Sequence, residues 1–136
     1  MQSRSLPSLA IVSPCFNEEN LIKINLRKLI DLLEMLSNKQ LIDFSQSSIY
    51  VVDDGSTDNS WKKLQEMNST YSQIKCIKLS RNFGHQNALL AGIIKSCEEI
   101  VISIDFDLQD DLEAVEKMIL KYNGGFEIVY GIKADR

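Results

Sequence analysis

Short apolar runs alternate with amphipathic stretches along the whole chain. Five runs rich in Val and Ile end at turn-forming or charged residues, as buried strands do: 9–12, 49–52, 74–79, 100–104 and 126–130. Between them, apolar residues recur every three or four positions and predict helices within 22–36, 61–71, 89–94 and 112–122. Asp110 and Glu113 have the spacing of a capping box for the last helix.

The alternation of strand and helix predicts an α/β fold. Its sheet should be Rossmann-like and mostly parallel, with helices on both faces. In such a sheet the carboxyl ends of the strands share one edge, and ligands bind in the crevice outside that edge. The residues that follow each apolar run are therefore the candidates for function.

Composition limits the classes of protein that remain. The chain has 136 residues, of which 44% are apolar and 25% charged, with a net charge of −4, as expected for one globular domain. No block of Lys or Arg indicates nucleic-acid binding. The three cysteines are widely spaced and predict reduced thiols. No apolar run is long enough to span a membrane, and the first residues do not form a signal peptide, so a cytoplasmic location is expected.

Acidic residues concentrate at the predicted strand ends. Segments 13–20, 53–58, 80–86 and 105–110 follow the first four runs and would bring up to seven carboxylates to one edge. A cation would relieve the repulsion between such charges. Asp105, Asp107 and the amide oxygen of Gln109 suit a hard divalent ion such as Mg²⁺ or Mn²⁺, which commonly binds through carboxylates and substrate phosphates. The pattern therefore predicts a site for a metal together with a diphosphate.

Four motifs at these positions resemble the family 2 glycosyltransferases, which have the GT-A fold. They are Pro14-x-Phe16-Asn17-Glu18, Asp53-Asp54-Gly55-Ser56-x-Asp58, Arg81-Asn82-x-Gly84 and Asp105-x-Asp107-Leu108-Gln109-Asp110. The last motif is similar to that of the subgroup that transfers sugar to a polyprenyl (dolichyl or undecaprenyl) phosphate. The resemblance extends over about residues 8–136. It implies that residues 1–136 form the nucleotide-sugar-binding part of a GT-A domain whose acceptor side lies beyond Arg136.

The resemblance also implies roles for individual residues. Residues expected to bind the nucleotide sugar are Pro14, Phe16, Glu18, Asp53, Asp54, Arg81, Asn82 and Asp105. Which of the two adjacent residues Asp53 and Asp54 points inward is left open. Asp107 is the expected principal metal ligand, with Asp105 and Gln109 beside it. Lys133 and Arg136 are candidates for contact with the diphosphate or the acceptor.

The implied reaction is an inverting transfer of sugar from a UDP- or GDP-type donor to a polyprenyl phosphate, in cell-envelope glycan biosynthesis at the cytoplasmic face of a membrane. A phosphate acceptor is already anionic and would need no general base. His85 is interpreted as a polar residue at a helix start, with diphosphate contact as the alternative. Other functions considered are a non-catalytic nucleotide-sugar-binding fragment, a phosphohydrolase of the haloacid dehalogenase type and a receiver-type signalling domain.

Overall fold

A parallel sheet forms the centre of the molecule. The computed structural model describes residues 5–108 and 112–123. Its four strands are β1 (Leu9–Cys15), β2 (Ser48–Asp53), β3 (Ile74–Lys78) and β4 (Ile100–Ser103). They are all parallel and lie in the order β3-β2-β1-β4. The predicted α/β class with a parallel sheet is confirmed, and the fifth predicted strand, 126–130, lies outside the described residues.

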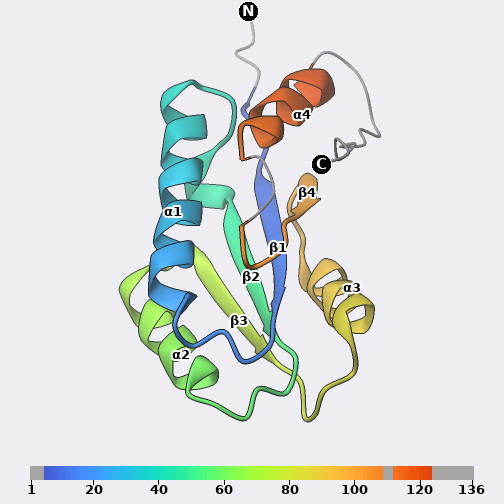
Figure 1. The fold of residues 1–136 in the computed structure, drawn as a ribbon. Helices are drawn as coiled ribbons and strands as arrows, with labels where there is room; N and C mark the ends of the chain where they lie inside the picture. Colours follow the sequence, from blue (N-terminus) through green and yellow to red (C-terminus); the bar gives the residue numbers. More distant parts are fainter. Residues whose placement is uncertain (1–4, 109–111, 124–136) are drawn as a thin grey trace, which may run out of the picture.

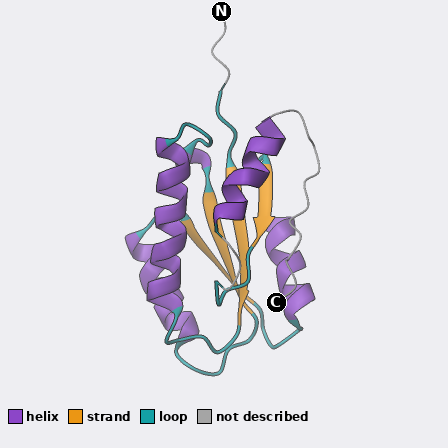
Figure 2. Cartoon of the chain, turned by 45° about the horizontal axis from the view of Figure 1, so that its top comes forward, coloured by secondary structure: helices purple, strands orange, loops and turns teal. Residues whose placement is uncertain are grey.

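Helices cover both faces of this sheet (Figures 1 and 2). They are α1 (Ile22–Asn38), α2 (Ser60–Thr70), α3 (His85–Lys95) and α4 (Glu113–Asn123), with a short 3-10 helix, η1, at Phe44–Gln46. The apolar residues of α1, α2 and α4 share one buried cluster with one face of the strands. On the opposite face α3 packs against β1 and β2 through a smaller cluster, which includes Ala10, Val12 and Tyr50.

Strand β1 is longer than its apolar run. The run was expected to end before Ser13 and Pro14, but both residues continue the pairing with β2, at Val51 and Val52. Proline is tolerated here because of the direction in which its backbone faces. The Val12 carbonyl accepts from Ile104 on the β4 side, so Pro14, two residues on, faces the same side, where β4 has already ended at Ser103. The missing N–H of proline therefore interrupts no ladder bond.

Helix α3 contacts the sheet through small residues and Leu89, while the other residues of its predicted apolar stripe face outward. Ile93 and Ile94, which the periodicity placed on the buried face, are 40% and 72% exposed. The buried residues are Ala88 and Gly92. A Cβ on Gly92 would lie 3.0 Å from Val52 Cγ2 and closer still to Val12 Cγ1. The helix lies so near the sheet that larger side chains do not fit, and the isoleucines turn outward.

The strand order leaves a crevice beside β1. The chain proceeds outward from β1 through β2 to β3, then returns across the sheet to add β4 on the other side of β1. Ligand sites in open α/β sheets form at the point where the strand order reverses, outside the carboxyl ends of the strands. Figure 1 shows the loops that follow β1, β2 and β3 gathered at the lower end of the sheet.

Candidate functional site

A cleft of about 470 Å³ lies at this reversal point. It is lined by the end of β1, the first residue of α3 and residues from the loops after all four strands: Pro14, Cys15, Phe16, Glu18, Asp54, Asn82, Gly84, His85, Asp105, Phe106 and Asp107. Seven of the residues expected to bind the nucleotide sugar or the metal are thus brought together, namely Pro14, Phe16, Glu18, Asp54, Asn82, Asp105 and Asp107. Gln109, Lys133 and Arg136 lie outside the described residues.

The two adjacent aspartates after β2 have different surroundings. Asp53 is fully buried, and its Oδ1 accepts from the backbone N–H of Ser56 at 3.2 Å. Its Oδ2 has no hydrogen-bond partner among the described residues. Asp54 lines the cleft instead, and its Oδ1 accepts from the backbone N–H of Phe83 at 2.8 Å. Of the pair, Asp54 is the one placed to reach a ligand in the cleft.

Gly55 brings the loop after β3 against the turn after β2. Its φ of +76° is accessible mainly to glycine, and a Cβ would lie 2.9 Å from Arg81 Cα and closer still to Arg81 C and Asn82 N. Asn82 consequently reaches the cleft. The guanidinium of Arg81 lies 4.3 Å from the centre of the Phe83 ring, and Arg81 is not among the lining residues.

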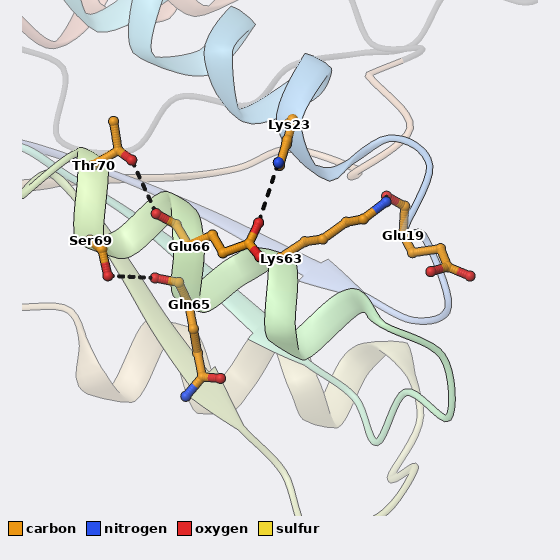
Figure 3. A network of polar contacts seen from close by, with 7 residues as sticks. All are labelled: Glu19, Lys23, Lys63, Gln65, Glu66, Ser69 and Thr70. Carbon is orange, nitrogen blue, oxygen red and sulfur yellow. Dashed lines mark hydrogen bonds and ion pairs between the residues drawn. The ribbon is translucent and has the colours of Figure 1, made fainter.

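The loop after β1 is fastened to the start of α2. The side chain of Asn17 accepts from the backbone N–H of Thr57 at 2.8 Å, and the hydroxyl of Ser60 accepts from the N–H of Glu18 at 3.0 Å. Lys63 Nζ donates to the carbonyl of Glu19 at 2.9 Å (Figure 3). These bonds hold Glu18 and the 44% exposed Phe16 at the cleft wall.

The turn after β4 carries two aspartates, one on each side of the buried Phe106. Ile104 N–H donates to the Val12 carbonyl, and Leu108 N–H donates back to the Asp105 carbonyl, both at 3.0 Å. Phe106, between the two aspartates, is only 4% exposed and belongs to the main core. Asp105 and Asp107 nevertheless both line the cleft.

The charge in the cleft is predominantly negative. Four carboxylate residues line it, and none of the described lining residues is Lys or Arg. His85 also lines the cleft, and its Nε2 lies 3.6 Å from Asp105 Oδ1. An anion such as a diphosphate would be repelled unless a cation accompanied it.

Asp105 and Asp107 are two carboxylate donors in one wall of the cleft, so a divalent ion held there would take its remaining ligands from elsewhere. Within residues 5–108 and 112–123 no group of three or more His, Cys, Asp or Glu side chains is arranged to hold a metal. Mg²⁺ in particular is commonly bound through one or two carboxylates plus phosphate oxygens and retained waters. The donor set therefore suits a metal that arrives with a diphosphate.

Three lining residues, Cys15, Gly84 and Phe106, had no role assigned to them from the sequence. His85, which was interpreted as a residue at a helix start with diphosphate contact as the alternative, is the first residue of α3 and also lines the cleft. Burial, with the nearby charges of Asp53 and Glu18, raises the pKa of the Cys15 thiol to about 12, so Cys15 remains an uncharged part of the wall.

Fold and cleft together define an α/β protein with a cleft lined by four carboxylate residues at the reversal point of its parallel sheet. The sequence model of glycosyl transferase family 2 matches residues 10–135, and the chain belongs to this family. The family assignment argues against both the dehalogenase-type phosphohydrolase and the receiver domain.

Individual relatives are similar over nearly the whole chain. An uncharacterized glycosyltransferase, YkoT of Bacillus subtilis, is 42% identical over 135 residues, which cover 98% of this chain and 40% of the relative. The undecaprenyl-phosphate 4-deoxy-4-formamido-L-arabinose transferase of Yersinia enterocolitica is 28% identical over 136 residues, covering 99% of this chain and 39% of that protein. The chain thus spans about 40% of the length of the curated relatives it matches.

The fold is also found in solved glycosyltransferases. The mannosyltransferase PcManGT of Pyrobaculum calidifontis, in complex with GDP-Man and Mn²⁺, superposes with a TM-score of 0.61 at 22% identity. The match covers 84% of this chain and 32% of that enzyme, and it supports the GT-A fold. In the part of the chain that the structure describes, no helix has the length and apolar character needed to cross a membrane.

Proposed function

We propose that this chain is the donor-binding part of an inverting glycosyltransferase. It binds a nucleoside-diphosphate sugar of the UDP or GDP type together with Mg²⁺ or Mn²⁺. The observation that carries the proposal is the cleft itself, which is lined by four carboxylates and an exposed aromatic ring but, among described residues, by no Lys or Arg. A cleft of this charge favours a diphosphate only when a divalent ion is bound with it.

The positions of the lining residues suggest how the donor is divided among them. Pro14, Phe16 and Glu18 form the wall on which the nucleoside rests, and Asp54 and Asn82 border it from the neighbouring loops. Asp53 supports this wall from beneath by holding the turn at Ser56.

The metal side of the cleft lies at the turn after β4. Asp107 and Asp105 would hold the ion, with Gln109 as a further ligand. A bound divalent ion stabilises the negative charge that develops on the departing nucleoside diphosphate. His85 lies beside Asp105 at the start of α3, where it can contact the diphosphate. Lys133 and Arg136 are proposed as further phosphate contacts.

The acceptor is proposed to be a polyprenyl phosphate. Support comes from the Asp-x-Asp-Leu-Gln-Asp sequence at 105–110 and from the similarity to an undecaprenyl-phosphate transferase. Such an acceptor places the reaction at a membrane face, the cytoplasmic one if the donor is a cytoplasmic nucleotide sugar. The alternative is a non-catalytic module that binds the nucleotide sugar without transferring it.

Calorimetry tests the donor site directly. UDP and GDP are titrated into the 136-residue chain with Mn²⁺ and with a chelator. We expect one of them to bind more tightly with Mn²⁺, and we expect Asp107→Asn to abolish the difference while leaving the chain folded. Failure of both nucleotides to bind the folded chain in the presence of Mn²⁺ would overturn the proposal.

Transfer itself is tested with the chain and its full-length relatives side by side. Radiolabelled nucleotide sugar is incubated with a short-chain polyprenyl phosphate, and the lipid phase is counted. Binding without transfer by the chain, with binding and transfer by a full-length relative, supports a donor-binding part. Binding without transfer by both would favour the non-catalytic alternative.

A further inference from the structure

A buried amide in α1 lies beneath the turn that carries the two cleft aspartates. We propose that Asn25 is a positioning residue for the carboxylates of Asp105 and Asp107. It holds the backbone between them and thereby sets the affinity of the cleft for a divalent cation. This inference rests on the proposed function, because it assigns a further residue to the same metal side of the cleft.

Asn25 is polar at a position where the helix is otherwise apolar. It lies on the buried face of α1 with Ile22, Leu26 and Leu29, and it is only 4% exposed. A polar side chain buried among leucine and isoleucine is unfavourable unless it makes a hydrogen bond. Asn25 makes such a bond with the turn after β4, which lies at the cleft.

The amide of Asn25 reaches a residue far away in sequence. Its Nδ2 donates to the carbonyl of Phe106 at 2.8 Å, across 81 positions, and the bond is buried. Phe106 is the residue between Asp105 and Asp107, and its own side chain is in the core. The turn is therefore fixed from beneath by one packed ring and one hydrogen bond, while its two aspartates line the cleft.

Loss of the Asn25 amide should displace the carboxylates of Asp105 and Asp107 more than other side chains of the cleft. With the donor removed, the buried carbonyl of Phe106 must turn or admit water to find a partner. Either change rotates the peptide units that flank it, and these units carry the aspartates. Metal sites require ligand positions within a few tenths of an ångström, and loss of outer-sphere support typically weakens metal binding by about 10–100-fold.

The test measures metal dependence separately from nucleotide binding. Wild type and Asn25→Leu, a change of similar volume that lacks the donor, are titrated with UDP and GDP, with a chelator and with increasing Mn²⁺. We expect Asn25→Leu to need about tenfold more Mn²⁺ for half-maximal enhancement. Its affinity for the nucleotide in chelator should match that of wild type, because Pro14, Phe16 and Asp54 come from β1 and from the loops after β1 and β2.

Asn68→Leu is the matched control. The Nδ2 of Asn68 also donates to a backbone carbonyl, that of Ile74 at 2.6 Å, but Ile74 begins β3 at the end of the sheet opposite the cleft. The control should leave both the Mn²⁺ requirement and the nucleotide affinity unchanged. If Asn25→Leu does not fold, Asn25→Ala, which leaves room for a water at the carbonyl, replaces it with the same expectation.

The possible outcomes distinguish a failure of the proposed function from a failure of the role of Asn25. A wild-type chain that binds neither nucleotide with Mn²⁺ overturns the proposed function and the inference with it. Metal-dependent binding that is unchanged in Asn25→Leu overturns the role of Asn25 alone. If Asn25→Leu and the control Asn68→Leu raise the Mn²⁺ requirement equally, Asn25 contributes only to general stability and its positioning role is overturned. The same conclusion follows if neither Asn25→Leu nor Asn25→Ala folds.

Discussion

Gly55 lies against the backbone of the loop after β3, and this contact predicts how much stability a side chain at this position would cost. In Gly55→Ala, the backbone must hold alanine at a φ of +76°, which costs about 1–2 kcal/mol. The new methyl group would also overlap the backbone of Arg81 and Asn82. Overpacking of this kind adds about 1–3 kcal/mol. We therefore expect a loss of about 2–5 kcal/mol in the free energy of unfolding, since the backbone atoms it meets cannot move aside as a side chain can.

Gly84→Ala separates the two contributions. Gly84 also has a positive φ, +95°, but a Cβ there would meet nothing within 4 Å. It should therefore cost only the backbone strain, about 1–3 kcal/mol. Both variants should remain folded if the domain has the usual stability of about 5–15 kcal/mol.

Urea unfolding followed by tryptophan fluorescence provides the measurement. The chain has one tryptophan, Trp61, which packs against the main core from α2 and therefore reports on unfolding. Gly55→Ala should unfold at a lower urea concentration than Gly84→Ala. If Gly55→Ala is no less stable than Gly84→Ala, the argument that the two loops are in steric contact at Gly55 is wrong.

Three further predictions concern the sheet and the helix packed against it. Gly92→Ala should lower the free energy of unfolding by a net of about 1–2 kcal/mol, because the new methyl group would overlap Val12 and this outweighs the better helix propensity of alanine. A variant that is as stable as wild type in thermal unfolding, or more stable, would contradict this. The pKa of Cys15, raised by burial to about 12, should keep that thiol from reacting with iodoacetamide at pH 8, while the exposed Cys97 is alkylated first, as peptide mass spectrometry would show. Because the unfolded thiol titrates near 9.0 and the folded one near 12, the contribution of Cys15 to stability is complete below pH 9 and is lost as the pH rises toward 12, which alkaline unfolding of Cys15→Ala against wild type would reveal.

The sequence predicted the sheet and the cleft because both depend on order along the chain. Apolar runs mark the strands, and parallel pairing brings whatever follows them to one edge, so Pro14, Asp54 and Asp107 could be expected to lie together. The choice between Asp53 and Asp54 could not be made, because it depends on which face of the sheet the last residue of β2 presents. That choice becomes clear only when the packing of the neighbouring loops is known.

Other features of the fold depend on distances between elements, which the hydrophobic periodicity of the sequence does not determine. The near approach of α3 to the sheet exposes Ile94 and buries Gly92, the reverse of what hydrophobicity alone predicts. The bond from Asn25 to Phe106 joins residues that only the fold brings together. A polar residue on the apolar face of a predicted helix was nevertheless a visible signal, and such residues merit attention when a site is sought from sequence.

The proline in β1 has a consequence for how the crevice stays open. Parallel strands tend to extend their pairing until one of them lacks a donor or turns away. At Pro14 the side of β1 that faces β4 has no N–H, so β1 donates no ladder bond beyond the place where Ile104 N–H bonds to the Val12 carbonyl. The chain after β4 is thereby released from the sheet at the point where its aspartates begin. Pro14, which marks the end of an apolar run in the sequence, thus lies where β1 and β4 stop pairing and where the wall of the cleft begins.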